Sequence, residues 1–167
     1  MDSSFKKVVA RRRSSKFGFK PGAGLPDEDL VSIVDAGRLA ATGGNMQPWE
    51  FIVVTDPEIL SRLKSCKPHT TAVIVLAYDM EKHLPDGRNY FIEDLSAATQ
   101  NILLAIESLH YGGCWVQGGL DIDNVVEVLN IPERYHVFNM VCIGRESLDD
   151  TRRDKRPLKE VIHWQGF

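Results

Sequence analysis

This chain of 167 residues has few cysteines and no long apolar run. Its longest uninterrupted apolar stretch, Ala72 to Tyr78, is far shorter than the roughly 20 residues that span a bilayer. Cys66, Cys114 and Cys142 are odd in number and widely spaced, so we expect reduced thiols rather than a disulfide framework or a zinc site. The N-terminus also lacks the apolar segment of a signal peptide. We therefore predict a cytoplasmic protein that does not bind membranes.

Several sequence patterns of well-known catalytic sites are missing as well. There is no G-x-G-x-x-G or Walker pattern, which argues against a doubly wound nucleotide-binding sheet. No Ser–His–Asp or Cys–His arrangement is recognisable, so we expect no catalytic side chain; Cys114 as a nucleophile stays open, but a buried thiol is preferred. No metal site is expected, because metal-ligand spacing is absent among the dispersed histidines His69, His83, His110, His136 and His163.

The hydrophobic pattern predicts a single α+β domain over residues 1–167. A content of 43% apolar and 26% charged residues is that of a soluble globular protein, and no repeat or linker interrupts it. Apolar spacing and turn residues predict helices over about 4–13, 26–42, 57–64, 92–111 and 125–129, a last helical turn at 158–162, and strands over 49–55, 71–78 and 137–143. Few strands without regular alternation with helices favour the α+β class.

Both ends of the chain are basic, whereas the middle is acidic. Residues 1–20 hold seven Lys and Arg against one acid, and residues 152–167 hold five against two acids. Two basic ends can meet at one anion, but solvated tails explain the same charges. A transit peptide or a nucleic-acid arm is disfavoured, because the basic residues run directly into a polar motif.

That motif is Arg12-Arg13-Ser14-Ser15-Lys16, which combines two guanidiniums, hydroxyls and an ammonium. Guanidinium binds phosphate through two hydrogen bonds, and a serine hydroxyl adds a donor. If the first helix continues through this motif, Arg12 and Lys16 share one helical face. A solvated basic helix remains the alternative.

Two further segments carry polar groups suited to a flat ligand. In ATGGNMQPWEF, the amides of Asn45 and Gln47 each offer a donor and an acceptor, which suits the edge of a heterocycle. Turn chemistry explains Asn45 well but Gln47 poorly. In GGCWVQGG, glycines surround an apolar, strand-like piece and allow backbone N–H groups, such as those of Gln117 and Gly118, to approach a ligand. Two ordinary turns are the alternative.

Taken in order, four strings resemble the FMN-dependent nitroreductase family: RRSSK, TGGNMQPWEFIVV, DLSAATQNILLAIESLHYGGCWV and KRPLKEVI. The resemblance extends from about Val9 to Trp164. It implies a nitroreductase-like mixed sheet flanked by helices, in a homodimer whose chains exchange terminal segments. One FMN is then expected at each of two sites between the subunits.

The resemblance also implies roles for residues near the ends of the chain. Arg12 and Ser14 are expected to bind the FMN phosphate, and Lys16 to reach N1 and O2 of the flavin. Arg13 either shares the phosphate or faces solvent. The phosphate site is closed by C-terminal residues, for which the resemblance suggests Lys155 and Arg156, with Arg153 as a further candidate.

In the middle of the chain, the resemblance assigns Asn45 and Gln47 to a segment that crosses to the flavin of the partner subunit. The family often has Pro-Ser where this chain has Thr42-Gly43. The stretch Gln117-Gly118 resembles the one whose backbone N–H points at flavin N5. Only this backbone role carries over to Gln117, because an acid is common there in some members.

The implied function is an FMN-dependent NAD(P)H oxidoreductase that reduces nitroaromatic, quinone or similar acceptors by ping-pong hydride transfer. A flavoprotein of the same fold with a dehalogenating, dehydrogenating or low-turnover flavin-binding role is the alternative. A nucleic-acid partner is not expected, given the acidic middle. Residues 79–93 form a short connection, so we predict a more open pocket, or one closed by Tyr90, Phe91 and the partner chain.

Overall fold

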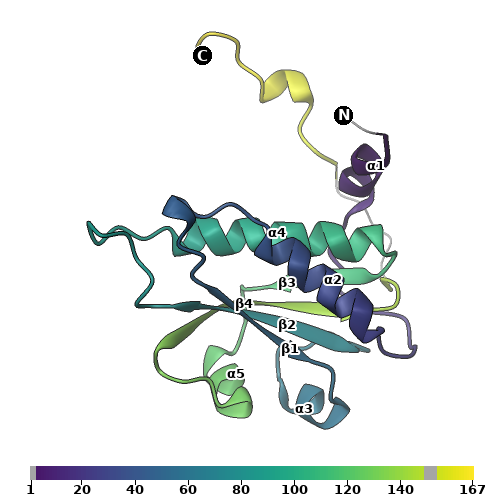
Figure 1. Ribbon diagram of the computed structural model, residues 1–167. Coiled ribbons are helices and arrows are strands. Elements are labelled where there is room, and N and C mark those ends of the chain that lie inside the picture. Colours follow the sequence, from purple (N-terminus) through teal and green to yellow (C-terminus); the bar gives the residue numbers. More distant parts are fainter. Residues whose placement is uncertain (1–2, 149–153) are drawn as a thin grey trace.

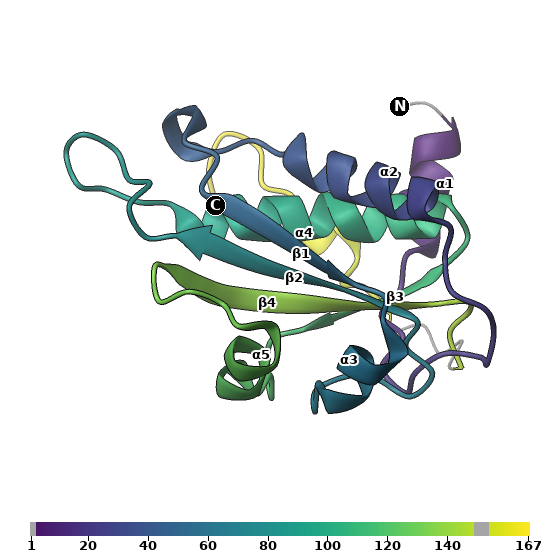
Figure 2. The same ribbon diagram turned by 60° about the horizontal axis from the view of Figure 1, so that its bottom comes forward.

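The computed structural model describes residues 3–148 and 154–167, and it has helices on both faces of one sheet (Figures 1 and 2). One face carries the two longest helices, α2 (Asp27–Arg38) and α4 (Phe91–Ser108), and the other carries α3 (Pro57–Arg62) and α5 (Ile122–Leu129). Helix α1 (Ser3–Arg11) stands beside the end of α4. Within the described residues, no helix is long and apolar enough to cross a bilayer.

The sheet has four strands in the order β1-β2-β4-β3, and each neighbouring pair is antiparallel. The strands are β1 (Trp49–Val54), β2 (Ala72–Asp79), β3 (Gly112–Val116) and β4 (Tyr135–Gly144). A parallel bridge between Ser14 and Gly113 extends the β3 edge. Together with the flanking helices, this arrangement confirms the predicted α+β class.

The central strand β2 explains the apolar stretch noted in the sequence, because both of its faces are covered. Ile74 and Leu76 pack toward α4, whereas Val73 and Val75 pack toward α3 and α5. The predicted face of α4 is buried in the first of these layers, through Leu95, Ala98, Ile102 and Ile106. A strand buried on both faces reads as a continuous apolar run rather than an alternating one.

Most predicted elements are present, and their ends shift by a few residues. The Asp56 carboxylate caps α3 as expected, since it accepts from the N–H groups of Glu58 and Ile59. A short 3₁₀ turn, η2 (Leu158–Glu160), stands in place of the predicted last helical turn. The prediction that the second helix continues to Gly43-Gly44 was wrong, because α2 ends at Arg38.

The glycine pair at Gly112-Gly113 begins a strand instead of only ending the long helix. Helix α4 stops at Ser108, and β3 starts at Gly112 and pairs with β4. A glycine is needed at Gly112, since a Cβ there would lie 2.9 Å from the buried ring of Phe19 and 3.0 Å from Ser15 Oγ. The element order predicted from the sequence therefore lacked one strand.

A buried carboxylate holds the far ends of β2 and β4 together. Asp79, the last residue of β2, is 1% exposed and accepts from Arg134 Nε at 2.9 Å, with a second contact from the same guanidinium. This hydrogen bond is the main reason that the pKa of Asp79 lies below its usual value. Because the pKa is lower in the folded chain, the pair stabilises the fold at neutral pH and loses this effect as the pH falls.

We therefore predict that Arg134→Gln lowers stability at neutral pH and flattens the loss of stability between about pH 5 and pH 2. Denaturant unfolding measured across that range checks this. Arg88→Gln removes the same charge from the exposed pair with Asp86 and serves as the matched control, expected to change stability little. An acid profile for Arg134→Gln that parallels the unchanged chain would contradict the assignment.

Candidate functional site

The basic N-terminal motif lies in extended conformation along the edge strand β3. Helix α1 ends at Arg11, and the Ser15 N–H then donates to the Gly113 carbonyl at 2.9 Å. The expectation that Arg12 and Lys16 share a helical face was wrong, because the sheet edge offers backbone partners that a longer helix would leave unused. The motif is thus held by the sheet and not by the helix.

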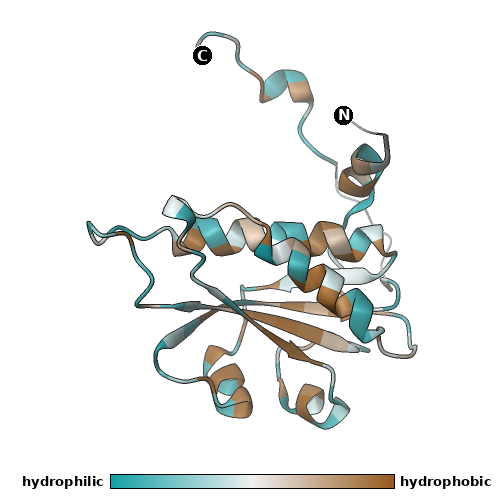
Figure 3. Cartoon of the chain, viewed as in Figure 1, coloured by the Kyte–Doolittle hydropathy of each residue, from teal (hydrophilic) through white to brown (hydrophobic). Residues whose placement is uncertain are grey.

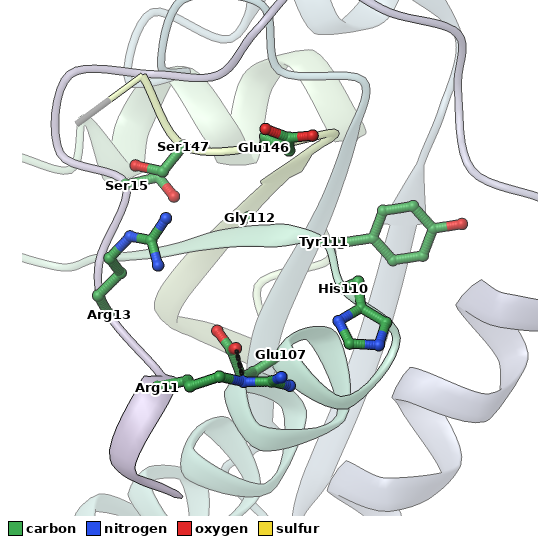
Figure 4. A pocket seen from close by; sticks show the side chains of 9 residues that line it. All are labelled: Arg11, Arg13, Ser15, Glu107, His110, Tyr111, Gly112, Glu146 and Ser147. Carbon is green, nitrogen blue, oxygen red and sulfur yellow. Dashed lines mark hydrogen bonds and ion pairs between the residues drawn. The ribbon is translucent and has the colours of Figure 1, made fainter. Parts of the chain in front are cut away.

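A cavity of about 190 Å³ lies beside the extended segment, and its lining shows which side chains of the segment point toward it (Figure 4). Arg13 and Ser15 line this cavity, whereas Arg12 and Ser14 do not. Successive side chains of an extended segment point to opposite sides, so Arg12 and Ser14 face away from it. The five-residue motif is therefore divided between two environments.

The cavity of Figure 4 already contains charges of both signs. Arg11 Nε lies 3.1 Å from Glu107 Oε1, and Glu146 also lines the cavity. The buried Ser15 hydroxyl has no hydrogen-bond partner among the described residues. An anion entering here would meet two carboxylates, so the opposite side, with Arg12, Ser14 and the exposed Lys16, is the better anion site.

The other end of β3 leads into an open glycine turn. Gln117, Gly118 and Gly119 are exposed, and a Cβ added at either glycine would meet no atom within 4 Å. Within the part of the chain that the structure describes, no acceptor contacts the Gly118 N–H. Strand β3 thus places this N–H and the basic motif along one sheet edge.

The segment from Thr42 to Gln47 has an uncommon backbone conformation. Gly43–Asn45 form a 3₁₀ turn, and both Asn45 and Gln47 have positive φ angles, of 57° and 49°. Left-handed conformations of residues other than glycine are unfavourable and cluster at functional sites. The side-chain amide of Gln47 donates to the nearby Asn45 carbonyl, and both side chains are exposed. Turn chemistry therefore accounts for their backbone but not for the two exposed amides.

Helix α4 and the connection before it hold this segment in place. The Asp94 carboxylate, 5% exposed, accepts from the Gly43 N–H at 2.9 Å. The Tyr90 ring covers the other side, since a Cβ on Gly43 would lie 2.3 Å from it, and a Cβ on Gly44 would lie 2.5 Å from Leu84. The sequence did not reveal Asp94, because its contact with Gly43 spans 51 residues.

Tyr90 lines an open pocket of about 320 Å³ together with Thr42, Gly43 and Asp94, whereas Phe91 does not line it. Tyr90 packs on Gly43, and the Phe91 ring stacks on Tyr78 with centroids 4.3 Å apart. Both aromatic side chains therefore anchor the start of α4 inside the subunit. The pocket closed by Tyr90, Phe91 and the partner chain stays a prediction, because it requires the second subunit.

The predicted ligand groups lie at opposite ends of α4. Asn45 and Gln47 are fixed near Asp94 at its start, whereas the basic motif begins beside Glu107 near its end. Thirteen helical residues rise roughly 20 Å. A single chain therefore does not bring the amide pair next to the phosphate-binding candidates.

The C-terminal candidates stand clear of the helices and sheet (Figure 1). All residues of 154–167 are exposed, including Lys155 and Arg156. Arg156 donates to the Glu160 carbonyl within the same segment. Arg153, the further candidate, lies outside the described residues.

No group of three or more His, Cys, Asp or Glu residues within 3–148 and 154–167 is arranged to hold a metal ion.

A family model described as Nitroreductase family matches residues 9–67 and 61–145. This chain belongs to the Nitroreductase family. The resemblance drawn from the four sequence strings is thereby confirmed.

Known proteins of similar sequence and fold agree with this family assignment. The chain is 33% identical, over 98% of both chains, to a candidate NADH dehydrogenase/NAD(P)H nitroreductase of Archaeoglobus fulgidus. It is 28% identical to an NADPH-flavin oxidoreductase of Vibrio harveyi, over 98% of this chain and 74% of that protein. The solved structure of an FMN-dependent nitroreductase of Clostridium difficile superposes with a TM-score of 0.76 at 27% identity, over 96% of this chain and 98% of that one.

In this nitroreductase-family chain, we predict that Asp94→Ala destabilises the fold by about 1–3 kcal/mol, because the Gly43 N–H loses its acceptor. Asp94→Asn keeps an oxygen acceptor and is expected to lose less. Denaturant unfolding compares the two, with Glu93→Ala as control, since Glu93 is an exposed acid in the same helical turn. Equal losses for Ala and Asn would show that the acceptor is not what matters.

Proposed function

We propose that this chain is an FMN-dependent NAD(P)H oxidoreductase that reduces nitroaromatic, quinone or similar small-molecule acceptors in the cytoplasm. We also infer that residues 1–167 act as one domain. The observation that carries the proposal is the edge of β3, where Arg12, Ser14 and Lys16 lie at one end and the open Gly118 turn at the other. The oxidoreductase class follows from family membership and from the names of the relatives.

The side chains on the outer side of the basic motif fit a phosphate monoester. Arg12 supplies a planar guanidinium, Ser14 a hydroxyl donor and Lys16 a mobile ammonium, away from the carboxylates of the cavity in Figure 4. Arg13 lies on the cavity side with Ser15, so we assign it a smaller part in phosphate binding. Lys155 and Arg156 are proposed to complete the site from an exchanged C-terminal segment.

The groups proposed to surround the flavin ring act through charge and hydrogen bonding. FMN, when bound, accepts hydride from NADH or NADPH and passes it to the acceptor, which is chemistry of the cofactor itself. The Lys16 ammonium is proposed to stabilise negative charge on the pyrimidine side. The Gly118 N–H is proposed to donate toward N5, and the Asn45 and Gln47 amides to bind polar edge atoms. No side chain is needed as a catalytic acid or base.

A homodimer is part of the proposal, because the amide pair and the basic motif are too far apart in one chain. The C-terminal segment also exposes five large apolar side chains, namely Leu158, Val161, Ile162, Trp164 and Phe167. Figure 3 shows apolar residues on this segment and on α1. A second copy of the chain provides a surface that can bury them.

The first test is the colour and redox behaviour of the purified protein. It is expected to be yellow, or to become yellow with added FMN, and to bleach when NADH or NADPH is added without air. Adding a nitroaromatic or quinone acceptor should restore the colour repeatedly. Bleaching without turnover of any acceptor would favour the low-turnover flavoprotein, and failure to bind FMN would overturn the proposal.

For the phosphate site, we predict that Arg12→Ala weakens FMN binding by about 1.5–3 kcal/mol, which is roughly 10- to 150-fold in Kd. Arg13→Ala removes the same charge from the cavity side and is expected to lose clearly less. Flavin fluorescence titration measures both. If Arg12→Ala binds FMN as tightly as the unchanged chain, the phosphate assignment is wrong.

For the dimer, we predict that Trp164→Ala raises the dissociation constant at least tenfold, since a buried interface tryptophan is often worth about 2 kcal/mol. Sedimentation equilibrium over a concentration series measures this. Ile122→Ala is the control, because Ile122 is also exposed but lies on the opposite face of the sheet, at the start of α5. A monomeric unchanged chain would rule out the exchanged segment.

A further inference from the structure

The open pocket of about 320 Å³ at the start of α4 has an acidic lining to which the proposed function gives no role. Its polar and aromatic lining residues are Thr42, Gly43, Tyr90, Glu93 and Asp94. Among the described residues, no Lys, Arg or His lines this pocket. A ligand that enters it therefore meets two carboxylates, a hydroxyl and an aromatic ring, and no positively charged side chain.

Acids in the first turn of a helix are common, because they interact favourably with the helix dipole. Glu93 and Asp94 occupy that turn of α4. The dipole does not balance their charge, since a helix N-terminus carries only about half a positive charge against two carboxylates. The Asp94 carboxylate is fixed by the Gly43 N–H at 2.9 Å, whereas Glu93 is exposed beside it. Glu93 is thus the carboxylate that a ligand can reach from solvent.

The basic side chains of the connection before α4 bind other groups. Arg88 forms an ion pair with Asp86 at 2.7 Å and donates to the Tyr90 hydroxyl at 3.2 Å. Lys82 donates to the Gln47 carbonyl, also at 3.2 Å. Neither cation lines the pocket. Their partners are therefore groups other than the two carboxylates of the pocket.

The pocket adjoins the segment that is proposed to reach the flavin of the partner subunit. Thr42 and Gly43 line the pocket, and the exposed Asn45 and Gln47 follow in the same segment. An acceptor must lie against the flavin ring to receive hydride, because the reacting atoms have to come into contact. If the proposed function holds, on which this step rests, a wall beside the ring is also a wall beside the acceptor.

We propose that Tyr90, Glu93 and Asp94 make the protein prefer aromatic acceptors that carry a positive charge over neutral and anionic ones. The Tyr90 ring and the Glu93 carboxylate bind the cationic group, since a cation is attracted both to an aromatic face and to a carboxylate. Reduction of a nitro group takes one hydride and one proton; an N–O bond breaks, and the products are a nitroso group and water. The cationic group takes no part in that step and acts only in binding.

The test uses three nitrobenzene acceptors whose polar group is separated from the ring by one CH₂, namely 4-nitrobenzylammonium, 4-nitrobenzyl alcohol and 4-nitrophenylacetate. With the FMN-bound protein, kcat/KM is expected to fall in that order. Glu93→Gln is expected to lower kcat/KM for the ammonium compound by at least roughly fivefold relative to the alcohol, because one of the two attracting charges is lost. The comparison between proteins removes any difference in reduction potential among the acceptors.

Glu133→Gln is the matched control. Glu133 is an exposed acid in the loop between α5 and β4, and α5 lies on the other face of the sheet from α4 (Figure 2). This variant loses the same charge and is expected to keep the order and the ratios of the unchanged protein. An equal loss in Glu93→Gln and Glu133→Gln would show that only net charge matters and would overturn the inference.

A binding measurement without turnover separates this inference from the proposed function. Benzylammonium added to the oxidised, FMN-bound protein is expected to shift the NMR signal of the Gly43 amide, and phenylacetate is not; Glu93→Gln is expected to weaken the first effect. No shift at Gly43, or a charge preference that Glu93→Gln leaves unchanged, would overturn the inference. Failure to reduce any of the three acceptors would instead count against the proposed function, whereas binding of benzylammonium that depends on Glu93 would still support the cation site.

Discussion

The hydrogen bond from the Ser15 N–H to the Gly113 carbonyl is the contact on which the candidate site depends. It places the basic N-terminal residues on the edge of the sheet, where they are extended and not helical. Alternation along the extended backbone then separates Arg12 and Ser14 from Arg13 and Ser15.

Glycines allow close packing at this sheet edge, because the main chain there lies directly against an aromatic ring with no Cβ between them. Phe19 is fully buried and packs where Gly112 and Gly144 have no Cβ. A similar device operates at the start of α4, where Gly43 lies between the Asp94 carboxylate and the Tyr90 ring. In both places, a core side chain holds a segment whose polar groups remain exposed.

The short connection between β2 and α4 holds the segment from Thr42 to Gln47 in place. Tyr90 and Leu84 of this connection lie against Gly43 and Gly44, near the start of α4 and at the opposite end of that helix from the basic motif. In the proposed dimer, a second chain would approach the exposed amides of Asn45 and Gln47 and cover the exposed apolar side chains of the C-terminal segment. The proposed dimer explains them together.

Much of the fold was predictable from local pattern, because the spacing of apolar residues shows whether a helix or strand is buried on one face or on both. The face of α4, the buried run of β2 and the Asp56 cap of α3 all follow from neighbours within a few residues. Strand β3 was not predicted as an element, since Gly112-Gly113 were interpreted as the end of the long helix and the strand-like Cys-Trp-Val is short until β4 pairs with it. The end of α2 was also misplaced, since the apolar spacing continues to Ala41 although the helix ends at Arg38.

By itself, the sequence determined the class of the fold, the family to which the chain belongs and the chemical types of the candidate ligand groups. Those properties depend on composition and on order along the chain. Only the tertiary structure decided which side of the basic motif faces outward, what holds Gly43 and that the free thiols of Cys66, Cys114 and Cys142 lie in or against one apolar cluster. Such contacts join residues far apart in sequence, and they exist only after strands and helices have packed.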